Sequence, residues 1–142
     1  MNKVSIYTTT LVARFWLKIG NKTEVDINLH DLPTLHLAKG NEVFTEAGPG
    51  YLFTIAMLVK GEKGKYDFAM TFIVVDLAKK EPKIEDNFIV FPTAILDDDY
   101  HEECVTIEGN LAFRHSKPLQ ILHAKFASIW LQMLLTLGYL KN

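Results

Sequence analysis

Residues 51–77 read YLFTIAMLVKGEKGKYDFAMTFIVVDL, and this stretch decides the fold. Apolar side chains alternate along both halves, 51–60 and 65–77, and the polar segment Gly61–Gly64 separates them. Period-two alternation is typical of strands, and a short glycine-bounded connector closes hairpins. Because both faces of each half are largely apolar, we expect this hairpin at the centre of a sheet, with cover on each side.

The segment before this hairpin also favours strands. Residues 4–19 hold the β-branched run Thr8-Thr9-Thr10 and then an alternation that places Leu11, Ala13, Phe15, Leu17 and Ile19 on one face and Val12, Arg14, Trp16 and Lys18 on the other. With the turn Gly20-Asn21 and the alternation that follows it, residues 11–30 are predicted to form a hairpin. Pro33 interrupts the ladder, so we expect a short edge strand at Leu35–Leu37 and a loop over residues 39–50.

After the central hairpin, the pattern predicts short strands joined by polar segments. The charged stretch 78–86 is expected to be an exposed linker. We expect a strand at 88–91 that ends at Pro92, a loop at Asp97-Asp98-Asp99, a strand at 103–107, and a turn at Gly109-Asn110 that leads into a strand at 111–114.

The C-terminal segment is predicted to be a long helix. Ser116 can cap it, Pro118 suits its first turn because the missing N–H is not needed there, and Gly138 can end it. A helical wheel gives one broad apolar face that we expect to pack on the sheet, made of Leu119, Leu122, Phe126, Ile129, Trp130, Met133 and Leu137.

A second apolar or small stripe on this helix needs a second partner. It consists of Ile121, Ala124, Ser128, Leu131 and Leu135. We predict that these residues, together with Trp16, form an interface with another copy of the chain; the open alternative is a segment of the same chain not yet placed.

These elements predict one domain, residues 1–142, of the α+β class. Its antiparallel, twisted, sandwich-like sheet has about six or seven strands, and the long C-terminal helix packs on it. In outline, an antiparallel sheet that carries a long helix is similar to the oligomeric export chaperone SecB, and none of that family's sequence motifs is present.

Composition excludes several classes of function. The formal net charge is −2, and the 15 Lys and Arg residues are scattered, so a nucleic-acid partner is not expected. The single cysteine, Cys104, fits a reducing compartment, and we expect the cytoplasm. The apolar stretch 126–140 reaches only about 22 Å as a helix, which is short of a ~30 Å hydrocarbon core, so a membrane partner is not expected either.

The one dense polar cluster lies at residues 97–104. Its metal-ligating candidates are Asp97, Asp99, His101 and Glu103, but the spacing of a calcium loop or a zinc site is missing, so we predict a solvated loop and no metal.

We expect no catalytic residue and no cofactor. Carboxylates beside Cys104 disfavour its thiolate, so we interpret it as a small packed residue. His123 lies at the margin of the apolar helix face, where a hydrogen-bonded core histidine is expected, and Ser116 is explained by capping.

The sequence therefore favours a non-enzymatic protein-interaction module, such as an adaptor, inhibitor or holdase-like binder, that acts as a homo-oligomer and binds another protein. The alternative is a small-molecule- or metal-binding domain or enzyme, whose pocket would lie between sheet and helix with residues 97–103 at its mouth.

Overall fold

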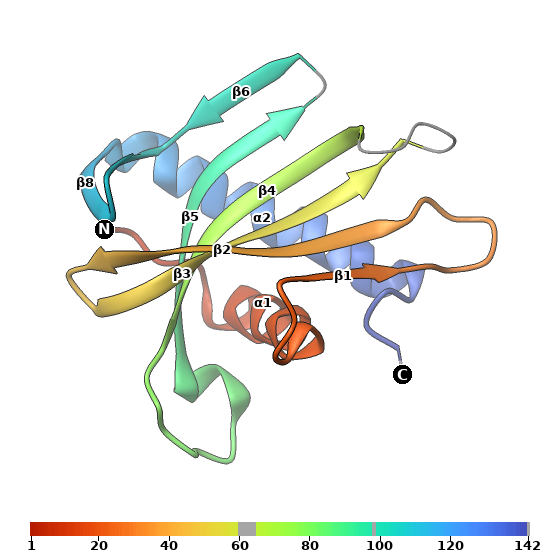
Figure 1. Ribbon diagram of the computed structural model, residues 1–142, viewed down its shortest axis with the longest axis horizontal. Helices are drawn as coiled ribbons and strands as arrows, with labels where there is room; N and C mark the ends of the chain where they lie inside the picture. Colours follow the sequence, from red (N-terminus) through yellow and green to blue (C-terminus); the bar gives the residue numbers. More distant parts are fainter. Residues whose placement is uncertain (60–64, 98, 142) are drawn as a thin grey trace.

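The computed structural model describes residues 1–59, 65–97 and 99–141 (Figure 1). Along the chain, one long helix precedes the strands and another follows them. The elements are α1 (Ile6–Ile19), β1 (Glu24–Ile27), β2 (Leu35–Thr45), β3 (Gly48–Leu58), β4 (Tyr66–Asp76), a 3-10 turn η1 (Ile84–Asn87), β5 (Phe88–Asp97), β6 (Tyr100–Glu103), β7 (Val105–Glu108), β8 (Leu111–His115) and α2 (Lys117–Leu137).

Within the described residues the strands form one eight-stranded sheet in the order β6-β5-β4-β3-β2-β8-β7, with β1 paired to β2. Every pairing is antiparallel except a single parallel bridge between Phe44 of β2 and Leu111 of β8. The predicted hairpin is confirmed: β3 and β4 pair in register at the centre, with Ile55 opposite Met70. The predicted connector Gly61–Gly64 lies outside the described residues.

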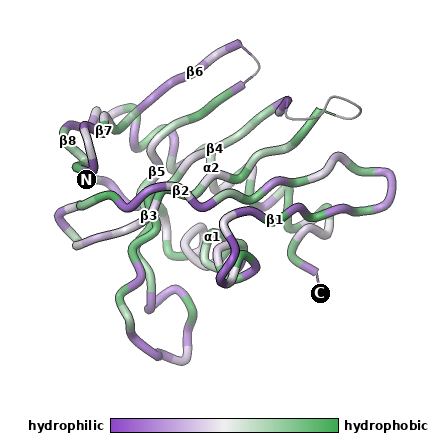
Figure 2. Tube along the Cα trace, viewed as in Figure 1, coloured by the Kyte–Doolittle hydropathy of each residue, from purple (hydrophilic) through white to green (hydrophobic). Residues whose placement is uncertain are grey.

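Both helices cover one face of this sheet, and Figure 1 shows α2 running behind the strands. The main core joins buried side chains of α1 and α2 to the inward residues of the central strands, among them Leu37, Phe53, Phe72 and Val90. Figure 2 shows β4 and β5 as largely hydrophobic and β6 as hydrophilic. The α+β class and the long C-terminal helix are therefore confirmed.

The opposite face of the sheet has its own, smaller core. Val43, Ile73, Val75 and Phe91 are buried there, and Ile107 of β7 and Ala112 of β8 pack against them. The β7–β8 hairpin thus folds over this face, which gives β4 apolar contacts on both sides as its sequence predicts.

The predicted N-terminal strand is wrong, because residues 6–19 form α1. Leu11, Phe15 and Ile19 are buried, which fits both the period of two of a strand and the period of 3.6 of a helix. Val12 is also fully buried and Leu17 is 57% exposed, and only a helix explains both. The Ser5 hydroxyl accepts the N–H of Thr8 as an N-cap. Burial against the sheet outweighs the strand propensity of the threonine run, and the predicted hairpin 11–30 is replaced by β1 paired with β2.

The predicted loop at residues 39–50 is also wrong. β2 extends over 11 residues and lies beside the central strand β3, so Leu35–Leu37 is not a short edge strand. The polar letters that suggested a loop fall at a bulge, because the register with β3 shifts between Lys39 and Glu42.

Pro92 does not end its strand, since β5 continues to Asp97. The proline lies opposite Phe72, where the register with β4 shifts, and a bulge is one of the few places where a strand tolerates a missing N–H. The predicted strand at 103–107 is divided at Cys104 into β6 and β7. Within the predicted loop 97–99, Asp97 closes β5 and Asp98 lies outside the described residues.

Candidate protein interface on the C-terminal helix

The capping signals of α2 are confirmed. The Ser116 hydroxyl accepts the N–H of Leu119, Pro118 lies in the first turn, and Gly138 adopts the left-handed conformation with φ 103°. The Gly138 N–H bonds back to the carbonyls of Leu134 and Leu135. These ends fix the helix at Lys117–Leu137 and determine which side chains share each of its faces.

One face of α2 packs on the sheet. Its buried residues are Gln120, His123, Ala127, Trp130, Leu131 and Leu134. We expected a broad apolar face of α2 to cover the sheet. Of its seven residues Trp130 is buried, and five of the other six are exposed to solvent. Leu131, expected at an interface, is fully buried in the core.

A second face of α2 turns toward α1. Ile121, Ala124, Ser128 and Leu135 are half-buried, and Ala124 and Leu135 pack against the main core. The Tyr7 hydroxyl of α1 donates a hydrogen bond to the Gln132 side chain of α2. The chain itself therefore covers much of each of these side chains, and α1, which we predicted as a strand, packs beside α2.

A third face of α2 is apolar and exposed. We call it the open stripe: Leu122 is 58% exposed, Phe126 40%, Ile129 71%, Met133 42% and Leu137 39%. We expected all five against the sheet, but they are exposed, and of their rings only that of Phe126 contacts an aromatic ring of the sheet among the described residues, Phe68 of β4. Their spacing of three and four residues keeps them on one side of the helix.

The open stripe is large for a surface that faces water. Its five side chains together expose on the order of 500 Å², taking roughly 200 Å² for a large apolar side chain in the open. The largest apolar patch of a typical monomer has about 300–600 Å², and such a patch is often functional. The stripe also rests on rigid packing, because the Phe126 ring lies 5.3 Å from Phe68, which contacts the Trp130 ring at 4.8 Å.

A polar network ties the first half of α2 to β6. The Nε2 atom of His123 lies 2.6 Å from Oε1 of Glu102, and the Tyr100 hydroxyl donates to Oε2 at 2.6 Å. The Tyr100 hydroxyl and then the His123 imidazole hold the pKa of Glu102 below its usual range, while the carboxylate raises the pKa of Tyr100. His123 is thus a hydrogen-bonded core histidine, although its Nδ1 atom has no partner among the described residues.

Cys104 is a packed residue, as expected. It is 2% exposed, and its Sγ donates to the carbonyl of Pro92, which also accepts from Nε2 of Gln120. Burial raises the pKa of the thiol to about 12, so the nucleophilic thiolate is disfavoured at neutral pH.

The metal-ligating candidates do not converge. His101 and Glu103 share one face of β6, with 3.4 Å between Nε2 and Oε1, whereas Asp97 ends β5 and Asp99 lies in a turn. In residues 1–59, 65–97 and 99–141, no three His, Cys, Asp or Glu side chains are close enough to hold a metal ion.

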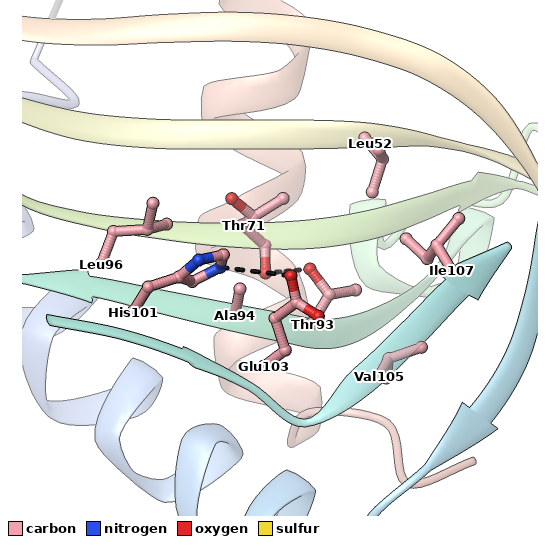
Figure 3. A pocket seen from close by; sticks show the side chains of 9 residues that line it. All are labelled: Leu52, Thr71, Thr93, Ala94, Leu96, His101, Glu103, Val105 and Ile107. Atoms are coloured by element: carbon pink, nitrogen blue, oxygen red, sulfur yellow. Dashed lines mark hydrogen bonds and ion pairs between the residues drawn. The ribbon is translucent and has the colours of Figure 1, made fainter.

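His101 and Glu103 line a shallow pocket of about 220 Å³ (Figure 3). Leu52, Thr71, Thr93 and Ile107 are among the other residues that line it, and Figure 3 shows Leu52 and Ile107 at the opposite end of the pocket from His101. The residues come from β3 to β7, so the pocket does not lie between sheet and helix, as expected, but on the face away from the helices.

Trp16 was expected on an exposed strand face, but it lies on α1 and is half-buried. Its ring stacks on Tyr51 at 6.2 Å and meets Phe53 edge-on at 5.3 Å. The Lys39 ammonium covers Tyr51 at 4.3 Å and Trp16 at 5.1 Å. Partners within the chain therefore account for much of the apolar surface that made Trp16 an interface candidate.

Comparison with known proteins identifies no relative: no family model, no curated protein and no solved structure matches the chain. The similarity in outline to SecB therefore carries no argument about function. Among the helices of the described residues, none has the length and apolar character needed to cross a membrane.

Proposed function

We propose that this protein is a non-enzymatic protein-interaction module that acts as a homo-oligomer through α2 and presents a further surface to another protein. The observation that carries the proposal is the open stripe, with Ile129 71% exposed at its middle. Burying such a side chain against a partner would stabilise the complex by about 2 kcal/mol relative to leaving it in water.

The polar chemistry of the described residues supports the non-enzymatic part. The Tyr100–Glu102–His123 network joins two elements and its histidine is buried, so it holds β6 against α2. The free thiol of Cys104 is buried and fits a reducing compartment, so we place the module in the cytoplasm.

The test is the solution mass of the native chain and of a variant with Ile129→Glu and Met133→Glu, measured by light scattering over a dilution series. The proposal predicts a native assembly that the two charges dissolve into folded monomer, because a carboxylate resists burial in an apolar contact. A matched variant with Asn21→Glu and Asn41→Glu changes the net charge by the same amount at exposed positions outside α2 and should leave the assembly intact. A native chain that is monomeric at every concentration contradicts the proposal.

The pocket of Figure 3 favours a second candidate function, the binding of a small apolar molecule beside His101 and Glu103. Its 220 Å³ is below the usual ~300–1,000 Å³ of ligand sites, which ranks this function second. Titration with an anilinonaphthalene sulfonate dye in the Ile129→Glu background tests it. Saturable binding that Leu52→Trp abolishes supports a ligand site, and binding that Leu52→Trp leaves unchanged excludes it.

A further inference from the structure

We infer that the partner of the open stripe is the open stripe of a second copy, with the two α2 helices antiparallel and a twofold axis between residues 129 and 130. This inference rests on the proposed function, and it specifies which surface covers the open stripe and how the two helices are oriented. In a twofold contact, residue i of one copy meets residue j of the other, and j meets i.

The spacing of the stripe suits this axis. With an axis between residues 129 and 130, a residue of one copy lies opposite the residue of the other copy for which the two residue numbers add up to 259. It therefore places Leu122 opposite Leu137 and Phe126 opposite Met133, while Ile129 of each copy lies beside the axis. Four of the five members therefore pair with another member, and the two copies of Ile129 lie next to each other across the axis. The pairing of Phe126 with Met133 gives a favourable sulfur–aromatic contact.

The charges on α2 favour the antiparallel arrangement over the parallel one. The helix carries Lys117 and Lys125 and no acidic residue. In a parallel pair the two Lys125 side chains lie at the same level. In the antiparallel pair they are nine residues apart along the axis, about 13 Å at ~1.5 Å per residue. That separation exceeds the ~8 Å Debye length of physiological salt, and the antiparallel helix dipoles also attract each other.

The area of the stripe fits a weak contact between two copies. Two open stripes of on the order of 500 Å² each bury up to about 1,000 Å² in total, below the ~1,200–2,000 Å² of stable interfaces and in the range of weak ones. The contact is small enough to dissociate on dilution, so we expect a dimer whose monomer is folded. The stripe itself holds no charged side chain that would call for a partner of opposite charge.

Cysteine cross-linking tests the geometry. One preparation carries Phe126→Cys, and a second, with a size tag, carries Met133→Cys; they are oxidised separately and as a mixture. In the antiparallel pair the two positions face each other, whereas a position and its own copy lie about 10 Å apart along the axis, beyond disulfide reach. We expect the mixed disulfide to exceed either same-position disulfide at least tenfold. The native chain is the control, because its Cys104 is buried.

A second pair, Leu122→Cys with Leu137→Cys, repeats the test at the other end of the stripe, and light scattering confirms that each variant is dimeric. Same-position disulfides without the mixed product overturn the inference in favour of a parallel pair and leave the proposed function standing. Dimers that give no disulfide at either pair overturn it in favour of a different interface. A monomeric native chain overturns the proposed function as well.

Discussion

Replacing Ile129 with alanine should weaken self-association without weakening the fold. Ile129 is 71% exposed, and alanine removes three carbon groups of its side chain. At about 0.8 kcal/mol for each buried CH₂ and this exposed fraction, the loss is about 2 kcal/mol for each copy. Both copies in the dimer carry the substitution, so the free energy of association weakens by about 4 kcal/mol and the Kd rises about a thousandfold.

Sedimentation equilibrium measures the Kd, and urea unfolding of the dilute monomer measures the fold. The free energy of unfolding should change by less than about 0.5 kcal/mol, because substitutions at exposed positions seldom cost more. Lys117→Ala is the matched control at an exposed position on the same helix, away from the stripe, and it should leave the Kd within about threefold. An unchanged Kd for Ile129→Ala, or a loss of monomer stability above about 2 kcal/mol, would show that Ile129 is not a contact residue on the surface of a stable monomer.

Three other predictions concern the buried parts of the fold. Leu131→Ala should lower the free energy of unfolding by about 2–5 kcal/mol in urea titrations, because Leu131 is fully buried; a loss below about 1 kcal/mol would contradict its core position. Glu102 has a lowered pKa in the fold, so its contribution to stability is present above the unfolded pKa near 4.5 and is lost as the pH falls through the folded value. Glu102→Gln should therefore flatten the acid side of the urea midpoint against pH, and an unchanged slope would contradict the network. Cys104, with a pKa of about 12, should react with a thiol reagent at pH 8 only as fast as the protein opens, whereas rapid labelling of the native protein would contradict its burial.

The parts of the fold that local pattern determines could be predicted. The β3–β4 hairpin has two segments that are apolar on both faces, and their β-branched and aromatic residues and the glycines between them favour strands over a buried helix. The ends of α2 follow from Ser116, Pro118 and Gly138, because their capping chemistry acts within a few residues.

The N-terminal helix could not be predicted from the same signals, since Leu11, Phe15 and Ile19 satisfy a strand and a helix equally. The burial of Val12 and the exposure of Leu17 distinguish the helix from the strand, but both are known only from the structure. The Thr8-Thr9-Thr10 run favoured the strand, and packing of α1 against η1, the sheet and α2 outweighed it. The Ser5 cap was the available signal for a helix start.

This one error also misplaced the candidate site. With α1 taken as a strand, the stripe that includes Ile121 and Leu135 had no partner within the chain, so it became the predicted interface. The apolar stripe that includes Leu122 and Ile129 was then assigned to the sheet. A helix wheel gives the faces of α2, but the neighbours that cover each face are set by distant segments of the chain.

The most direct test of the open stripe as a contact surface is the accessibility of isoleucine methyl groups to a soluble paramagnetic probe in nuclear magnetic resonance. Ile6, 75% exposed, is the accessible reference, and Ile73, fully buried, is the protected one. The account predicts that the Ile129 methyl is protected like that of Ile73 at high protein concentration and becomes accessible like that of Ile6 on dilution. An Ile129 methyl as accessible as that of Ile6 at every concentration would contradict it.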